Sequence, residues 1–309
     1  MVCQEETSLC NDQEEADTKV FLAAQHAVTN HNAESVCIFT IDTDIVIYSL
    51  YFSFKINVSF FIFIGVKDRT RILNVNQIAQ SLGKKCCLAL PAFHAFTGND
   101  YTSAFFGIGK VRSFKLLVNV KKFMKVFRKL GQTTTFNSQL FQTLEEFVCR
   151  LYGSKSVDTN KARYEKFTSG KVVPPPEKLP PTRDALLCHC KRVSYVTSMV
   201  KKCLSPMTGM PSPDGFGWRM EDNDSSLSIQ WMLLPPAPEE ILQLICCNCK
   251  KLMCKSAACI CVSHGLPCTD LCRCDGDGDS CDNVYNKNND IDGDSSGSEM
   301  EDEDGEDDC

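Results

Sequence analysis

Residues 246–281 read CCNCKKLMCKSAACICVSHGLPCTDLCRCDGDGDSC and hold ten of the chain's twenty cysteines. Thiols crowded this closely cannot all form disulfides without strain, whereas each Cys-x-Cys pair places two thiolates on one short loop, which suits a tetrahedral zinc ion. A disulfide knot in a secreted protein is the alternative. The first residues, MVCQEETSLCNDQEEAD, lack the basic and apolar segments of a signal peptide. The sequence therefore predicts a structural zinc site.

The spacing CNCKKLMC…CICVSHGLPCTDLCRC resembles the tesmin-type CXC domain of nuclear DNA-binding and chromatin proteins. In that family nine cysteines share three zinc ions through bridging thiolates. Eight positions match here, namely Cys247, Cys249, Cys254, Cys259, Cys261, Cys268, Cys272 and Cys274. The ninth ligand stays open between Cys281, which lies farther along than the family pattern expects, and Cys246. Because Ala258 replaces the tyrosine that enters the minor groove in DNA-binding members, we do not expect this module to read DNA sequence.

The charge of the chain is divided unevenly. From residue 275 to the end there are fifteen Asp or Glu and one Lys, a net of −14 within a total of −6, so the rest of the chain carries +8. An acidic tail on a basic body is common in proteins that meet nucleic acid, because the tail competes with phosphate for the basic surface. The tail has few apolar residues, and we expect it to be disordered.

The chain is long enough for two domains with linkers, and we expect an α/β class. The predicted helices are 14–28, 75–82, 86–96, 110–130, 140–152, 183–204 and 239–245, and 36–41 is predicted as a strand buried in a parallel sheet. The apolar stretch 45–65 contains Lys55 and Asn57 and is dense in β-branched and aromatic residues. It is therefore predicted to form buried strands, not a membrane span.

Changes in composition suggest six regions. They are a disordered N-terminus over 1–13, an α/β domain over 14–150, a proline-rich linker over 151–182, a helical or irregular region over 183–245, the zinc module over 246–281 and the acidic tail over 282–309.

Three acidic clusters occupy positions that suit a catalytic site. Glu15 and Asp17 open a helix, Asp42 and Asp44 follow the carboxyl end of a strand, and Asp100 sits at a helix break. Open α/β sheets build their sites at that end of the strands. Each cluster also has an ordinary explanation, since acids at helix starts favour the dipole and a strand-ending Asp often caps a turn.

The ordered set EEADTKVFLAAQHA, TIDTDIVIYSL and LPAFHAFTGNDYTSAFFGIGKVRSFKLL resembles the second half of the flap-endonuclease-type PIN-like nuclease domain, over about residues 13–120. The resemblance implies a partial parallel sheet with a helix–turn–helix, and catalysis with two Mg²⁺ or Mn²⁺ ions. The matching ligands are Glu15, Asp17, Asp42, Asp44 and Asp100. Such chemistry needs carboxylates that hold two hard cations about 4 Å apart.

The segment after GIGK is strongly basic. Residues 110–130 carry eight Lys or Arg and no acid, and the GIGK turn directs backbone N–H groups towards a phosphate. Like charges in one segment repel unless a polyanion binds them, so duplex or branched DNA is the predicted partner. The predicted contacts are Gly107, Gly109, Lys110, Arg112, Lys115, Lys121, Lys122 and Lys125.

In the PIN-like family a first strand and further aspartates precede the helix pair. This chain begins about a dozen residues before Glu15. We therefore expect a truncated domain with weak or no cleavage, either from an incomplete gene model or in a decayed copy. The whole arrangement resembles transposable-element-derived reading frames of invertebrates.

The predicted function is nucleic-acid binding in the nucleus, with no membrane partner and with chromatin proteins as further possible partners. The alternatives are a non-catalytic chromatin-binding protein and a protein-interaction scaffold.

Overall fold

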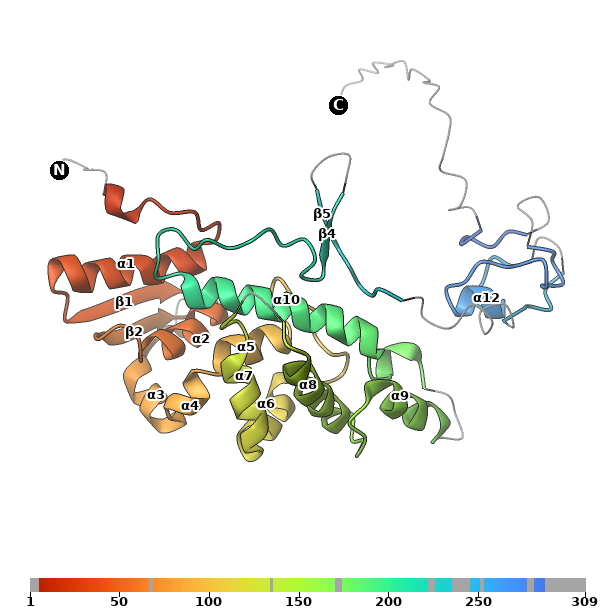
Figure 1. The fold of residues 1–309 in the computed structure, drawn as a ribbon, viewed down its shortest axis with the longest axis horizontal. Helices are drawn as coiled ribbons and strands as arrows, with labels where there is room; N and C mark the ends of the chain where they lie inside the picture. The colour runs from red at the N-terminus through yellow and green to blue at the C-terminus, as the bar shows by residue number, and fades with distance from the viewer. Residues whose placement is uncertain are drawn as a thin grey trace, which may run out of the picture. The chain divides into compact units, whose positions relative to one another are not determined.

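The computed structural model describes residues 6–66, 69–133, 136–169, 174–221, 226–234, 245–250, 253–276 and 281–286. These residues fall into two compact units, 1–233 and 234–309 (Figure 1). The first unit combines helices with two small sheets, and the second is built around a cysteine cluster. The predicted helix 239–245 and most of the predicted tail, from residue 287 on, lie outside the described residues.

The larger sheet contains β1 (Ser35–Thr40), β2 (Ser59–Ile64) and β3 (Arg71–Asn74), in that order. β1 pairs with β2 in parallel and β3 pairs with β2 antiparallel, so the sheet is mixed and not the parallel sheet that was predicted. β1 is also buried on one face only. Ile38 is 6% exposed while its neighbour Phe39 is 73% exposed. The expectation of a fully buried strand was wrong, because an apolar run cannot show which of its two faces is covered.

Helices surround one face of this sheet. They are α1 (Ala16–His31), α2 (Thr43–Phe52), α3 (Val75–Leu82), α4 (Lys84–Cys87) and α5 (Leu90–Phe96). α3 matches its predicted bounds, since Asn74 caps its start and Gly83 follows its end. The prediction of strands over 45–65 was wrong for the first half of that stretch, which forms the helix α2, while β2 lies in the second half. Asp42 caps α2 by accepting a hydrogen bond from the Asp44 N–H at 2.8 Å. No helix in the described part of the chain combines the length and apolarity needed to cross a membrane.

The basic segment 110–130 forms two helices instead of the predicted one. α6 (Lys110–Asn119) and α7 (Lys121–Lys129) meet at Val120, whose backbone is extended. Leu117 and Phe123 are both 0% exposed and belong to the same core. On one straight helix these two side chains would point about 120° apart, since successive residues turn by about 100°. The break therefore lets both helices bury their apolar faces together.

The first unit also contains helices, short 3-10 helices and a hairpin outside the sheet. They are the 3-10 helices η1 (Thr7–Leu9) and η3 (Pro176–Lys178), the helices α8 (Ser138–Leu151), α9 (Thr159–Thr168) and α10 (Arg183–Lys202), and the hairpin of β4 (Trp218–Met220) with β5 (Leu227–Ile229). α10 runs along α5 and α8 (Figure 1). It contributes Val193 to the core of the helices and Val200 to the core beneath the sheet.

The region predicted as a linker over 151–182 packs against this unit. The buried Glu145 carboxylate of α8 accepts hydrogen bonds from the Thr159 N–H at 3.1 Å and from Arg183 Nε at 3.2 Å. α8, α9 and α10 are thus joined by one buried acid, and the unit extends to residue 233, not to 150. A proline-rich composition did not reveal this, because the segment is joined to Glu145 and Arg183, which lie on either side of it in the sequence.

The N-terminal segment also makes defined contacts. The Gln13 side-chain amide donates a hydrogen bond to the Cys203 carbonyl at 2.7 Å, and the Asp12 carboxylate accepts one from the Thr208 N–H at 3.0 Å. Asp12 and Gln13, which were expected to belong to a disordered terminus, are thus held against the chain that leaves α10.

Candidate metal centre and carboxylate pocket

The second unit gathers nine cysteine sulfurs. Among the described residues, four groups have all their Sγ atoms within 4.8 Å of one another. The groups are Cys247, Cys249, Cys254 and Cys259; Cys247, Cys268, Cys272 and Cys274; Cys247, Cys259, Cys261 and Cys268; and Cys254, Cys268, Cys274 and Cys281. The short helix α12 (Ile260–Ser263) positions the middle of the cluster.

The distances between these sulfurs fit zinc. The Sγ atom of Cys247 lies 3.8 Å from that of Cys254 and 3.7 Å from that of Cys274. Zn–S bonds of about 2.3 Å at tetrahedral angles place two sulfurs about 3.8 Å apart, whereas a disulfide needs about 2.05 Å. All the described cysteines of the chain are free thiols. The donor set is therefore compatible with a zinc module and not with a disulfide knot.

Two cysteines hold central positions in this cluster. Cys247 and Cys268 each belong to three of the four groups. A sulfur shared between groups can bridge two metal ions. Cys247 and Cys268 therefore occupy the positions in the cluster that suit bridging thiolates.

The ninth cysteine of the cluster is Cys281. Its Sγ atom lies 3.7 Å from that of Cys274, and its side chain is 0% exposed. Cys246 is exposed and belongs to none of the four groups. Sequence spacing could not choose between Cys281 and Cys246, because only the folded arrangement shows which sulfur reaches the other eight.

Residues just beyond the cysteines support the cluster from outside. Asn283 is fully buried, and its Nδ2 donates to the Cys268 sulfur at 3.2 Å and to the Leu266 carbonyl at 2.9 Å. The Asn286 side chain pairs with the Cys268 backbone, accepting its N–H at 2.7 Å and donating to its carbonyl at 3.0 Å. Residues 282–286 were assigned to the acidic tail and are instead part of the module. Hydrogen bonds of this kind orient metal ligands and stabilise the thiolate.

Backbone N–H groups also point at sulfur. The N–H groups of Cys247 and Thr269 donate to the Cys272 sulfur, each at 3.4 Å. Burial acts to raise the pKa of Cys272, but these donors outweigh burial and lower it. A thiolate favoured in this way is ready to bind a metal ion.

In the first unit, four of the five predicted catalytic acids line one small pocket. Glu15 and Asp17 come from the start of α1, Asp44 from the first turn of α2, and Asp100 from the turn after α5. Tyr48, Tyr101 and three apolar residues of α10 complete the lining, and the volume is about 40 Å³. Three separate segments thus bring their carboxylates to a space sized for ions and water.

Neighbouring negative charges at this pocket make Asp17 harder to ionise. Burial and then the charges of Asp42, Asp44, Glu15 and Asp100 raise the pKa of Asp17. Asp42, the fifth predicted acid, does not line the pocket, since it caps α2. The cysteine cluster is the only place in the described parts of the chain where three or more ligand atoms lie within 4.8 Å of one another. The carboxylates are neighbours but do not form a closed metal cage.

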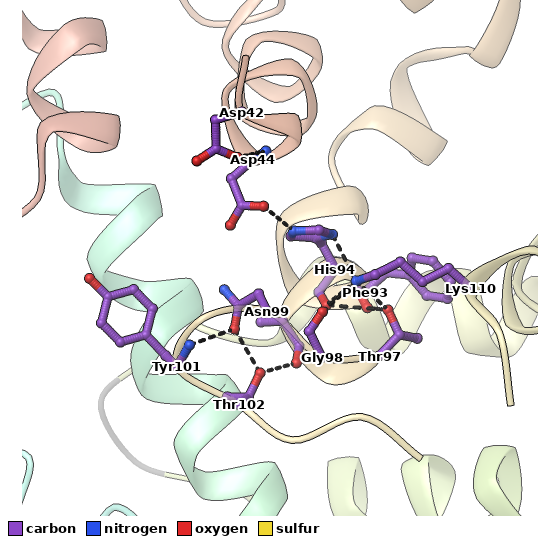
Figure 2. Close-up of polar contacts among 11 residues, drawn as sticks. Asp42, Asp44, Phe93, His94, Thr97, Gly98, Asn99, Tyr101, Thr102 and Lys110 are labelled. Atoms are coloured by element: carbon purple, nitrogen blue, oxygen red, sulfur yellow. Dashed lines mark hydrogen bonds and ion pairs between the residues drawn. The ribbon is translucent and has the colours of Figure 1, made fainter. Parts of the chain in front are cut away.

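A histidine that was not predicted anchors this pocket (Figure 2). His94 Nε2 lies 2.7 Å from Asp44 Oδ1, and His94 Nδ1 lies 3.1 Å from Lys110 Nζ. Because an ammonium group can only donate, Nδ1 accepts from Lys110 and Nε2–H donates to Asp44. Burial acts to raise the pKa of Asp44, but the hydrogen bond and the charge of His94 act in the opposite direction, and the pKa is lowered. His94 stands in the apolar run LPAFHAF, which gave no sign of a polar partner.

Lys110 was predicted to contact nucleic acid, but its ammonium group is directed into the protein. It also donates to the His94 carbonyl and the Thr97 hydroxyl, each at 3.3 Å, and to the Gly98 carbonyl (Figure 2). These acceptors lie at the carboxyl end of α5, where a cation is favourable. Lys110 therefore holds the loop before Asp100 in place.

The other predicted contacts remain at the surface. Arg112, Lys115, Lys121 and Lys125 are exposed and form no ion pair with any described residue. Lys122 instead pairs with Glu146 at 2.5 Å. A Cβ atom added at Gly107 or Gly109 would meet nothing within 4 Å, and only Gly107 has a positive φ, of +68°. The backbone at this turn is open to a ligand.

No family model, curated protein or solved structure matches the chain. The proposals that follow rest on the residues of this protein.

Proposed function

We propose that this chain is a nucleic-acid-binding protein with a zinc-binding module. The cysteine module of the second unit holds structural zinc, and the basic surface formed by Arg112, Lys115, Lys121 and Lys125 on α6 and α7 contacts phosphates. The observation that carries the proposal is the gathering of nine cysteine sulfurs at the spacing of a zinc cluster. The resemblance to CXC domains supports the link with nucleic acid.

The basic surface supports the second part of this proposal. Four exposed cations without an ion pair are available to neutralise phosphates, and the open backbone at Gly109 starts a ten-residue helix. The first N–H groups of such a helix have no partner within it and can receive a phosphate oxygen. Contacts of this kind give affinity without sequence preference.

Reversing one of these charges should weaken DNA binding. We expect Lys121→Glu to lower the affinity for duplexes of different sequence about equally, and to make the slope of log affinity against log salt shallower by roughly one. Fluorescence anisotropy at several salt concentrations measures both. The control is Lys161→Glu, which makes the same charge change on α9 and should have little effect. A salt-independent affinity of the parent protein would refute phosphate binding.

Removing the acidic tail should have the opposite effect. Deletion of 287–309 removes eleven Asp or Glu and one Lys. It should tighten DNA binding, because less negative charge competes for the basic surface. The deletion must begin after Asn286, since Cys281, Asn283 and Asn286 belong to the zinc module.

A second candidate function is metal-dependent phosphodiester hydrolysis at the carboxylate pocket. The observation that favours it is the meeting of Glu15, Asp17, Asp44 and Asp100 from three separate segments, as the resemblance to PIN-like nucleases implies. We expect weak binding of one Mg²⁺ or Mn²⁺. We expect no robust cleavage of flapped, bubbled or nicked DNA, because the carboxylate oxygens are not gathered into a cage of three or more.

Asp17→Asn tests this pocket in two ways. Binding of Mn²⁺ to the zinc-loaded protein, followed by electron paramagnetic resonance, should be lost in Asp17→Asn and kept in Glu34→Gln, an exposed acid outside the pocket.

The pKa of Asp17 is raised in the folded state, so its charged form opposes folding increasingly as pH rises above the unfolded value. Asp17→Asn should therefore raise the melting temperature at pH 7 and leave it unchanged at pH 3. Mg²⁺-dependent turnover by the parent chain that is lost in Asp44→Asn would instead establish an active nuclease.

A further inference from the structure

A second pocket of the first unit has the opposite charge. It is bounded by the ends of α2, α4, α7 and α10 and has a volume of about 310 Å³. Its lining consists of Tyr51, Lys55, Leu88, Arg128, Gly131, Gln132, Lys201 and Lys202. The volume lies at the lower end of the range for small-molecule sites, which is about 300–1,000 Å³.

Four of the eight lining residues are cations, and none is an acid. Lys55, Arg128, Lys201 and Lys202 form no ion pair with any residue that the structure describes. Lys55 lies over the ring of Tyr51, 5.7 Å from its centre. Cations near helix carboxyl ends are favourable by themselves, which accounts for charges at the ends of α7 and α10. It also favours Lys55, which lies three residues beyond the end of α2, but it does not explain why three helix ends bring their cations to one pocket whose lining contains no acid.

Arg128 supplies an independent sign of a missing partner. Its Nε atom is buried and has no hydrogen-bond partner among the described residues. Buried donors are nearly always satisfied in folded proteins, so a side chain of the pocket lining that keeps an unsatisfied N–H is consistent with a missing acceptor. A bound anion would also offset the charge of the four cations.

The pocket wall is held in place before any ligand enters. Lys201 Nζ donates to the Arg128 carbonyl at 3.0 Å and also to the Leu130 carbonyl, which fixes the turn after α7. At Gly131 in that turn φ is +66°, and an added Cβ would lie 2.6 Å from the Ser198 nitrogen. Burial, and then the charges of Lys55 and Arg128, lower the pKa of Lys201 to about 8. An anion would relieve this repulsion at a site that is already formed.

We propose that this cationic pocket, defined by Lys55, Arg128, Lys201 and Lys202, binds a small phosphate monoester of nucleotide size. A phosphate dianion carries the charge to balance several cations and the oxygen atoms to accept their N–H groups. No carboxylate in the pocket lining competes with it for these cations. The volume leaves room for more than the phosphate group alone. The proposal does not depend on DNA binding or on zinc binding, since none of these residues belongs to the cysteine cluster or to the four exposed cations of α6 and α7.

Calorimetric titration of the zinc-loaded full chain with adenosine monophosphate, in a chloride buffer without phosphate, tests this proposal. We expect one saturable site, and roughly tenfold weaker binding in Lys55→Gln and in Lys202→Gln. Lys129→Gln is the matched control, because Lys129 is exposed and adjacent to Arg128 but does not line the pocket. A parallel titration with inorganic phosphate should show weaker binding, since it contacts only part of the pocket.

Thermal melting separates loss of binding from loss of folding. Without ligand, Lys202→Gln should unfold cooperatively close to the parent temperature, because the repulsion that it relieves offsets the favourable interaction with the carboxyl end of α10 that it loses. Adenosine monophosphate should raise the melting temperature of the parent and of Lys129→Gln, but not that of Lys202→Gln. Absence of saturable binding, an equal loss in Lys129→Gln, or equal affinity for inorganic phosphate would overturn the proposal. So would displacement of the nucleotide by an oligonucleotide without terminal phosphates, which would assign the pocket to the nucleic-acid backbone.

Discussion

Chelation of zinc should unfold the second unit and leave the first unit folded. The buried core of the second unit consists of eight cysteines, supported at its edge by Ile245, Cys249 and Val262. Without metal this core offers almost no apolar surface, so the free energy of folding must come from metal–thiolate bonds, which supply about 10–16 kcal/mol in zinc-finger peptides. Metal analysis of the reduced full chain should give close to three zinc ions per chain. Amide exchange before and after chelation should show loss of protection only in the second unit.

Two cysteine substitutions make this expectation specific. Cys268→Ser should remove more than one zinc ion, because Cys268 belongs to three of the four sulfur groups. Cys246→Ser should leave the zinc content and the protection pattern unchanged, since Cys246 is exposed and outside every group. Less than one zinc ion per chain under reducing conditions would refute the zinc module.

Gly131→Ala should destabilise the first unit by about 2–5 kcal/mol. The left-handed backbone at Gly131 costs a residue with a Cβ about 1–2 kcal/mol, and overpacking in a tight contact adds about 1–3 kcal/mol. The contact is tight here because the new Cβ would lie 2.6 Å from the backbone nitrogen of Ser198 and 2.8 Å from the carbonyl carbon of Thr197, both on α10. Urea unfolding of the zinc-loaded chain, followed by circular dichroism, measures the change in free energy.

Gly153→Ala is the matched control for this experiment. Gly153 has a positive φ of +81°, but an added Cβ there would meet nothing within 4 Å. Its substitution should therefore cost only the backbone share, about 1–2 kcal/mol. Equal losses at the two glycines would show that the contact between the turn and α10 is not tight.

The elements with strong local signals were predictable from the sequence. α3 has an Asn cap, an amphipathic pattern and a following glycine, and its bounds match. α2 lacks such a signal, since its apolar residues lie on all sides, and apolar runs do not distinguish helix from strand. The break at Val120 was also hidden, because it depends on which core Leu117 and Phe123 share. Tertiary packing decided both cases.

In the candidate sites too, local sequence patterns predicted some residues, and tertiary contacts determined the others. Cysteine spacing predicted eight of the nine cysteines whose sulfurs gather in the cluster, because metal chemistry imposes short spacings along the chain. Cys281 and Asn283 lie farther along the chain, and only the fold brings them to Cys274 and Cys268. The pairing of His94 with Asp44 joins residues fifty positions apart, and no local pattern announces it.

The place of α10 has a consequence for synthesis of the protein on the ribosome. Gln13 and Cys203, which bond to each other, are separated by 190 residues, and α10 completes the core beneath the sheet. β1 ends at Thr40 and α10 ends at Lys202, so at about 5–20 residues per second the first strand waits roughly 8–32 s before α10 is complete. During that interval the apolar surface later covered by Val200 is open to water. We therefore expect the nascent chain to recruit a chaperone that recognises exposed apolar strands, and to release it once α10 has emerged.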